Sequence, residues 1–154
     1  IADGVFHVKK PERPGYQVKV ESQSTSSTTQ ITEVVEKIDI AAIMALGDVT
    51  TGEAIFKKCA ACHSIKKEGA NKIGPMLYGV VGRKVGHVSD YKYSKALASY
   101  GKEWTFEELN GFLTKPGSYL KGTKMSYAGL RKEADRASVI KYLNQNSDNP
   151  IPLP

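Results

Sequence analysis

Two cysteines, Cys59 and Cys62, lie three positions apart and are followed directly by His63. Residues at this spacing face the same side of a helical turn, so both sulfur atoms can point toward one object. Such a pair of thiols can form thioether bonds with the two vinyl groups of a porphyrin, and the histidine can offer a ring nitrogen to the iron. The pattern Cys-x-x-Cys-His therefore predicts one covalently attached haem c per chain.

Other kinds of site are possible for this run of residues. A zinc site needs four ligands, usually from two Cys or Cys/His pairs, and outside the run the chain offers only His7 and His87. A thiol redox pair would lie between a strand and a helix of a βαβ unit, a pattern that this sequence lacks. Both alternatives and a chance occurrence stay open here, with haem attachment favoured.

A haem iron held by histidine often takes a methionine on its other face. Met125 lies in a polar, glycine-bounded loop over 121–129, which is a poor setting for a core methionine. Met44 lies on an apolar helical stripe, as core residues do, and Met76 follows a proline and is interpreted as a local packing residue. His87 is the remaining competitor and is interpreted as an ordinary loop histidine. We therefore expect Met125 to be the second iron ligand.

The elements that position these groups are expected to be helices joined by long loops, with no convincing strand within 47–145. The apolar spacing and the capping residues predict helices near 32–46, from about 49 into Cys59, and over 91–99, 105–115 and 132–145. The second of these can be capped by Asp48, or by Thr50 with Glu53, and the fourth starts with the capping box Thr105 to Glu108. Glycine is dense in the loop over 64–90 and marks a second loop over 118–129. This pattern suggests backbone folded closely around something that is not protein. The predicted fold class is all-α.

Length and composition limit the organisation of the chain. Its 154 residues, 40% hydrophobic and 25% charged, are typical of one globular domain with a tail. No apolar run approaches the roughly 18 residues that a membrane span needs. Proline, charge and a Ser/Thr/Gln run over 22–30 predict an extended linker over 1–46 that ends in the short helix. The predicted haem domain covers 47–145, and 146–154 is an irregular tail.

Basic residues outnumber acidic ones, with a net charge of +6 for the whole chain. Residues 47–145 hold 17 basic and nine acidic side chains, a net charge of +8. Such a segment should meet acidic partners. The candidates for a basic ring around the cofactor edge are Lys58, Lys72, Lys121, Lys124, Arg131 and Lys132. No nucleic-acid module accompanies them, so nucleic acid is not an expected partner.

The sequence resembles the class I c-type cytochromes, the electron carriers of mitochondria and bacteria, over about 47–145. The motifs that carry the resemblance are Gly47-Asp48-Val49 with Gly52 and Phe56, Cys59-Ala60-Ala61-Cys62-His63, Gly74-Pro75, Gly82-Arg83-Lys84, Tyr91 to Ser94, Trp104-Thr105, Gly122-Thr123-Lys124-Met125 and the segment around Tyr142-Leu143. The resemblance implies the small fold in which helices and long glycine-rich loops wrap around a covalent haem.

The same resemblance implies roles for single residues. It makes Cys59 and Cys62 the points of covalent attachment, and His63 and Met125 the two iron ligands. The carbonyl of Pro75 would accept a hydrogen bond from the ring of the ligating histidine, which orients the ring and raises its basicity.

Three further residues, Arg83, Tyr93 and Trp104, match groups that bond or neutralise the buried haem propionates in the family. Two positions depart from the mitochondrial pattern. Phe112 replaces a tyrosine that reaches the methionine sulfur, and Leu97 replaces an asparagine. Both changes remove polar groups near the second ligand, so we do not transfer a mitochondrial redox potential to this chain.

By this resemblance the protein is expected to be a one-electron carrier, not an enzyme, between the ubiquinol–cytochrome c reductase complex and a terminal haem-copper oxidase. A haem peroxidase or a gas-binding protein with a displaceable second ligand is the alternative, and a fixed subunit of a respiratory complex is a third possibility. The stretch from Lys10 to Tyr16 looks like the one that follows the anchor in bacterial membrane-anchored members. We therefore expect an anchor upstream of Ile1 and a periplasmic location, or alternatively the mitochondrial intermembrane space.

Overall fold

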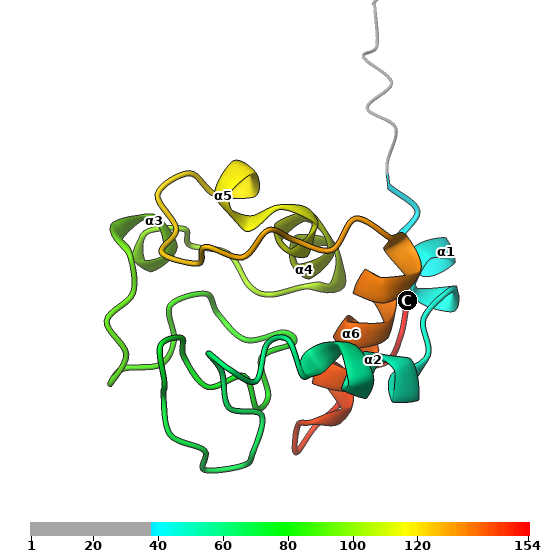
Figure 1. Cartoon of the computed structure of the whole chain (residues 1–154), viewed down its shortest axis with the longest axis horizontal. Coiled ribbons are helices and arrows are strands. Elements are labelled where there is room, and N and C mark those ends of the chain that lie inside the picture. The colour runs from blue at the N-terminus through cyan, green and yellow to red at the C-terminus, as the bar shows by residue number, and fades with distance from the viewer. Residues whose placement is uncertain (1–37) are drawn as a thin grey trace, which may run out of the picture. The chain divides into compact units, whose positions relative to one another are not determined.

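A computed structural model describes residues 38–154 of the chain, which form helices and loops without a strand in that range (Figure 1). The helices are α1 (Ile40–Ala45), α2 (Val49–Phe56), α3 (Lys95–Ala98), α4 (Phe106–Thr114), α5 (Pro116–Tyr119) and α6 (Glu133–Gln145). Long loops join α2 to α3 and α5 to α6. The predicted all-α class with long loops is confirmed.

Helix α6 is the element on which α1, α2 and α4 all pack, as Figure 1 shows for the crossing of α2 over α6. Gly52 makes the α2–α6 crossing close, because a Cβ there would collide with the carbonyl oxygen of Ser138. One turn further on, the rings of Phe56 and Tyr142 lie 5.3 Å apart between centroids. These two contacts hold α2 against α6.

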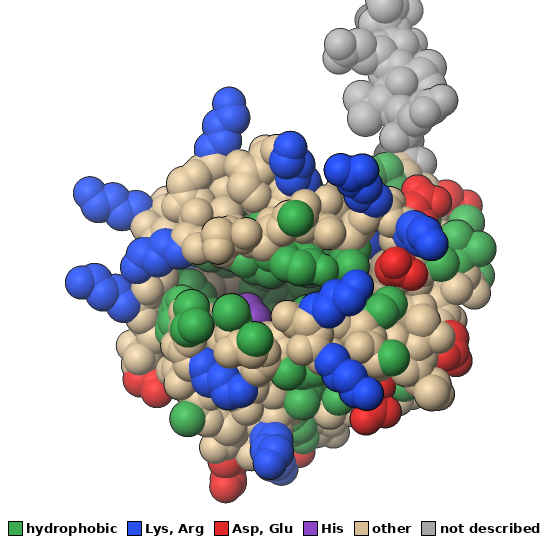
Figure 2. Space-filling model, viewed as in Figure 1, with side chains coloured by type: hydrophobic (Ala, Val, Ile, Leu, Met, Phe, Trp, Pro, Cys, Tyr) green, Lys and Arg blue, Asp and Glu red, His purple; other side chains and the backbone are tan. Residues whose placement is uncertain are grey.

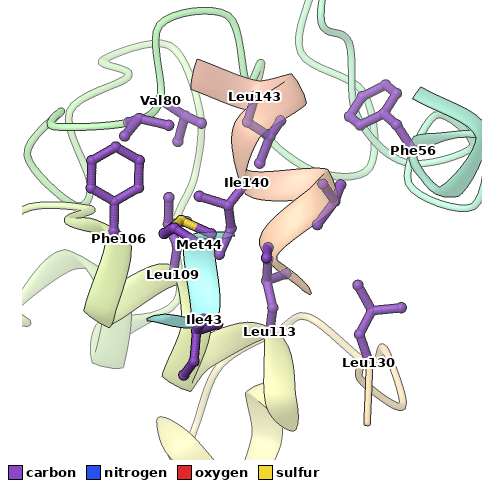
Figure 3. Close-up of a cluster of buried hydrophobic side chains, with 13 residues drawn as sticks. Ile43, Met44, Phe56, Val80, Phe106, Leu109, Leu113, Leu130, Ile140 and Leu143 are labelled. Carbon is purple, nitrogen blue, oxygen red and sulfur yellow. The ribbon is translucent and has the colours of Figure 1, made fainter. Parts of the chain in front are cut away.

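A buried apolar cluster joins the helices behind the crossing, and Figure 3 shows its side chains converging from α1, α4, α6 and the loops. Its best-buried members include Met44 and Ile140, which expose 1% and 0% of their surface. Met44 is thus a core residue, as its place on an apolar stripe predicted. From α4, Phe106, Leu109 and Leu113 belong to the same cluster.

Two of the helix starts can be compared with their predicted caps. The Asp48 carboxylate accepts a hydrogen bond of 2.7 Å from the backbone N–H of Thr51, so Asp48 caps α2. The Thr105 hydroxyl accepts from the N–H of Glu108 at 3.2 Å, as in a capping box. The reciprocal bond is missing, because the Glu108 carboxylate accepts instead from Tyr100, Tyr119 and Lys102.

Two other segments differ from the expectation. The helix expected over 91–99 is only α3, four residues long, because the Ser94 side chain caps it at Leu97 N–H. Tyr91 lies before this cap and uses its hydroxyl to bond the carbonyl of Ile73 at 2.8 Å. Residues 116–119, expected to be loop, form the short helix α5 with Pro116 in its first turn, where a missing N–H costs nothing.

The N-terminal part of the described chain forms α1, within the helix that the sequence predicts near 32–46; residues 32–37 lie outside the described residues. Ile43 and Met44 belong to the main core, so the packed unit includes residues before Gly47. No helix between residues 38 and 154 is both long and apolar enough to cross a membrane. Residues 146–154 contain no helix.

We predict that Gly52→Ala lowers the free energy of unfolding of the holoprotein by about 1–3 kcal/mol, because the added methyl group forces α2 away from α6. Denaturant titration followed by circular dichroism measures this change. Gly117→Ala is the matched control: nothing lies within 4 Å of a Cβ at that position, and alanine there should leave stability unchanged or slightly higher. Equal losses in the two variants would contradict the close-approach argument.

Candidate functional site

The residues from Lys58 to His63 continue the path of α2 as a single helical turn. The N–H of Cys59 donates to the carbonyl of Phe56 at 2.7 Å, and the N–H groups of Cys62 and His63 both donate to the carbonyl of Cys59. Both cysteines are half-buried and line the same cavity. Burial raises the pKa of the Cys59 thiol, and the neighbouring Cys62 adds to the effect.

The imidazole of His63 is held in one orientation. Its Nδ1 lies 2.7 Å from the carbonyl oxygen of Pro75; a carbonyl can only accept, so Nδ1 carries the proton and Nε2 keeps its lone pair. Gly74 allows this approach, since a Cβ there would collide with the imidazole ring. Burial lowers the pKa of His63, against the effect of the Pro75 bond. The ring is therefore neutral at pH 7, the form that binds metals.

A cavity of about 490 Å³ opens beside this turn and is walled by α2, α4, α6 and the two long loops. Figure 2 shows its mouth as a cleft across the viewed face, lined with hydrophobic side chains, with a histidine visible inside. The volume lies within the range of cofactor pockets. Cys59, Cys62, His63 and Pro75 all belong to the wall.

Met125 also lines this cavity, and it is the one methionine of the three in the chain that does so. Its backbone N–H donates to the Thr123 hydroxyl at 3.2 Å. Met44 lies in the core instead, and neither Met76 nor His87 contributes to the wall. The structure thus brings Met125 and His63 into one cavity and leaves out the three competitors considered from the sequence.

The segment that follows Met125 is fixed by a residue that the sequence analysis did not single out. Arg136 of α6 is 5% exposed and donates to the carbonyls of Leu130 and Arg131, at 2.8 and 2.9 Å, and to the Asn110 side chain at 2.7 Å. A buried arginine needs partners for its donors, and backbone carbonyls of an irregular segment supply them. The polar spacing of α6 gives no signal that Arg136 faces inward.

Arg83, Tyr93 and Trp104 all line the cavity as well. Arg83 donates to the carbonyls of Tyr78 and Met76 at 3.0 and 2.9 Å. Burial lowers the pKa of Arg83, and burial raises the pKa of Tyr93. The N–H of Trp104 donates to the carbonyl of Arg83 at 2.9 Å, so these two residues lie side by side on neighbouring backbone segments.

The two positions that depart from the mitochondrial pattern, Phe112 and Leu97, are both in the wall. The Phe112 ring packs against Trp104, with 4.9 Å between ring centroids, and against Tyr119 at 6.3 Å. Neither position therefore contributes a side-chain hydroxyl or amide to the wall.

The residues present fit a haem. An apolar cavity suits the porphyrin body, and the adjacent thiols suit its attachment. The two bonds of Arg83 use two of the five N–H groups of its guanidinium, so three remain among the described residues for an anionic group such as a propionate. Between residues 38 and 154 no three His, Cys, Asp or Glu side chains gather into a metal cluster, so a zinc site lacks its ligands there.

The rim of the cavity is basic. Lys58, Lys84 and Lys124 contribute to the wall, and blue side chains surround the cleft in Figure 2. Lys124 also donates to the carbonyl of Lys92 at 3.1 Å, which links the Met125 loop to the loop before α3. Ile73, 79% exposed, belongs to the same rim.

Comparison with known proteins identifies one family. The model of the family described as "Cytochrome c" matches residues 49–147. A "Cytochrome c homolog" of Bradyrhizobium diazoefficiens is 38% identical over 99% of this chain and 84% of its own length. A "Cytochrome c" of the fungus Gibberella zeae is 45% identical over 68% of this chain and 99% of its own length.

A solved structure is similar too. Cytochrome cH from Methylobacterium extorquens matches with a TM-score of 0.60 and 37% identity, covering 64% of this chain and 99% of its own. This chain therefore belongs to the cytochrome c family: it is a class I c-type cytochrome with covalently bound haem c, an electron carrier for redox partners and not an enzyme.

Proposed function

We propose that this cytochrome carries single electrons from the ubiquinol–cytochrome c reductase complex to a terminal haem-copper oxidase, with His63 and Met125 as its two iron ligands. The observation that carries the proposal is the presence of both side chains in the wall of one cavity. The bond from Nδ1 to Pro75 leaves Nε2 as the nitrogen for the iron. Two protein ligands leave no position for a substrate, which suits a carrier.

Each remaining site residue has a part in holding the cofactor. Cys59 and Cys62 provide the thioether sulfurs, and the Pro75 carbonyl keeps the His63 ring oriented and electron-rich. Arg83, Tyr93 and Trp104 supply donors toward the propionates from neighbouring parts of the wall. When bound, the haem supplies an iron that gains and loses one electron. The protein contributes ligation, exclusion of water and a surface for partners.

The basic rim is the proposed docking surface for both partners. Lys58, Lys84 and Lys124 stand where the cavity opens, so an acidic partner face would approach the cofactor edge there. Charge attraction of this kind speeds encounter more than it tightens binding. Weak, fast docking suits a protein that must leave each partner after one electron.

We further propose that the segment before α1 tethers the haem domain to a membrane anchor upstream of Ile1, on the periplasmic side of a bacterial inner membrane. The proline-rich and Ser/Thr-rich composition of residues 10–30 supports a linker. The similarity to the Bradyrhizobium relative extends over 99% of the chain, so that relative shares this segment and not only the haem domain. A mitochondrial intermembrane location is the alternative.

For the iron ligand, we predict that Met125→Leu abolishes the weak long-wavelength absorption band of a methionine-ligated ferric haem and lowers the midpoint potential. The reason is that leucine has no sulfur to bind the iron and opens that position to water. Optical titration of the purified holoprotein measures both. Met76→Leu is the matched control and should keep the band, since Met76 is outside the wall. A band that survives Met125→Leu would exclude Met125 as the ligand.

For docking, we predict that Lys124→Glu slows electron transfer with the purified reductase by roughly threefold to tenfold at low ionic strength and makes the rate less sensitive to salt. Stopped-flow kinetics over a salt series measures this. Lys66→Glu makes the same charge change at an exposed lysine outside the cavity wall and should have a smaller effect. If both variants slow the rate equally, the rim is not a specific docking surface.

For the tether, we predict that cells expressing the native gene retain the haem protein in the membrane fraction after a high-salt wash and release it only with detergent. An anchor is held by apolar burial, which salt does not weaken, whereas a basic protein adsorbed on acidic lipid is screened off. Release by salt alone would contradict the anchor while leaving the electron-carrier assignment unaffected.

A further inference from the structure

The residues after α6 do not leave the domain but double back beside it, as the red end of the chain shows in Figure 1. Asn144, 5% exposed near the end of α6, holds this return with both ends of its side-chain amide. Its Nδ2 donates to the carbonyl of Ile151 at 2.7 Å, and its Oδ1 accepts from the N–H of the same residue at 3.0 Å. The backbone of Ile151 is therefore fixed in place and in direction.

The returning segment also makes hydrogen bonds to the loop that precedes Arg83. The N–H of Gly79 donates to the carbonyl of Asn146 at 2.8 Å. The Asp148 carboxylate accepts from Lys67 at 2.6 Å and from the Tyr78 hydroxyl at 3.1 Å. These bonds attach the segment to residues 78 and 79 from two sides. The ion pair is exposed, so its contribution to stability is small, and the backbone bond fixes the geometry.

Ile151 covers the backbone immediately before Arg83. A Cβ at Gly82 would collide with Cδ1 of Ile151, so the isoleucine side chain lies directly over that glycine. Ile151 is 38% exposed, which means that most of its surface is in contact with the domain. An apolar group in this place keeps water away from the outer side of the wall that carries Arg83.

The orientation of Arg83 depends on that same loop. Its guanidinium donates to the carbonyls of Met76 and Tyr78, which are the two backbone groups that aim it into the cavity wall. Movement of residues 76–82 would therefore move the cation. The segment over 146–151 contacts the loop at Tyr78, Gly79 and Gly82, so it is placed to prevent such movement.

We propose that residues 146–151 act as a strap, in which Asn144 and Ile151 are positioning residues that hold Arg83 against the cofactor and shield it from water. The proposal rests on the proposed role of Arg83 toward the haem. Loosening the strap has two physical effects with the same sign. A positive charge near the haem favours the reduced state, so moving Arg83 away weakens that preference. Water that enters the wall favours the oxidised state, which carries the higher charge. Both effects lower the midpoint potential.

The test is a double-mutant cycle on the full-length holoprotein, with the midpoint potential as the readout. Ile151→Gly removes the cover while changing a partly exposed side chain outside the core, so the domain should fold. We expect a lower potential in this variant, an unchanged potential in the conservative variant Ile151→Leu, which keeps a δ carbon, and an unchanged potential in Leu153→Gly, which changes a 49% exposed side chain of the same tail. A purely structural role of the tail would change the unfolding midpoint and leave the potential of the folded protein unaltered.

The second arm of the cycle uses Arg83→Gln, alone and with Ile151→Gly. If the strap acts through Arg83, the single variant lowers the potential, and adding Ile151→Gly then lowers it by less than Ile151→Gly does in the unmodified chain, because only the effect of water entry remains. A full additional drop in the double variant would overturn the assigned route through Arg83. An effect of Arg83→Gln with none of Ile151→Gly would overturn the strap alone. No effect of Arg83→Gln would overturn the proposed role of Arg83 itself, which separates the two failures.

Discussion

The close crossing of α2 over α6 is the contact from which the rest of the site follows. Gly52 has no side chain to hold the helices apart, and the Ser138 hydroxyl accepts the N–H of Asp48 at 3.0 Å while Lys141 donates to the carbonyl of Gly47 at the same distance. α2 is thereby fixed along its first turn as well as at Phe56. Because the chain continues from Phe56 directly into the turn of Cys59, the position of α2 on α6 also places the imidazole at the cavity.

Most of the remaining wall is loop, and loops leave backbone carbonyls without partners. In this protein, histidine and arginine side chains donate hydrogen bonds to several of these carbonyls. The imidazole of His63 bonds the Pro75 carbonyl, Arg83 bonds two carbonyls of the loop before it, and Arg136 bonds two carbonyls beyond Met125. Each bond satisfies a backbone group and also sets the orientation of a cavity residue or of the segment that bears it. A small chain can thus enclose a large cofactor with little regular structure.

Local signals in the sequence predicted most of the helices, and the family resemblance supplied site residues such as Pro75, Arg83, Tyr93 and Trp104, which all line the cavity. The sequence identifies Asp48 and Thr105 as caps because a cap depends on residues within one turn. It wrongly predicts the return bond from Glu108 to the backbone of Thr105, because the Glu108 carboxylate has three partners outside that turn that no local pattern reveals. The inward face of Arg136 and the return of Ile151 onto Gly82 are missed for the same reason. Contacts made by irregular segments depend on tertiary placement, which periodicity does not report.

Under the proposed function, the positive charges in the cavity wall and those at the exposed rim have different effects. Arg83 lies in the wall, where burial lowers its pKa and where a charge acts through a less polar medium than at the surface. The electric field of Arg83 there affects the midpoint potential of the haem and is little affected by salt. Lys124 and its neighbours stand at the open rim, where solvent screens them. Their field bears on how often partners meet the cavity mouth. The same formal charge can therefore set a potential inside the protein and an encounter rate outside it, and each can change without the other.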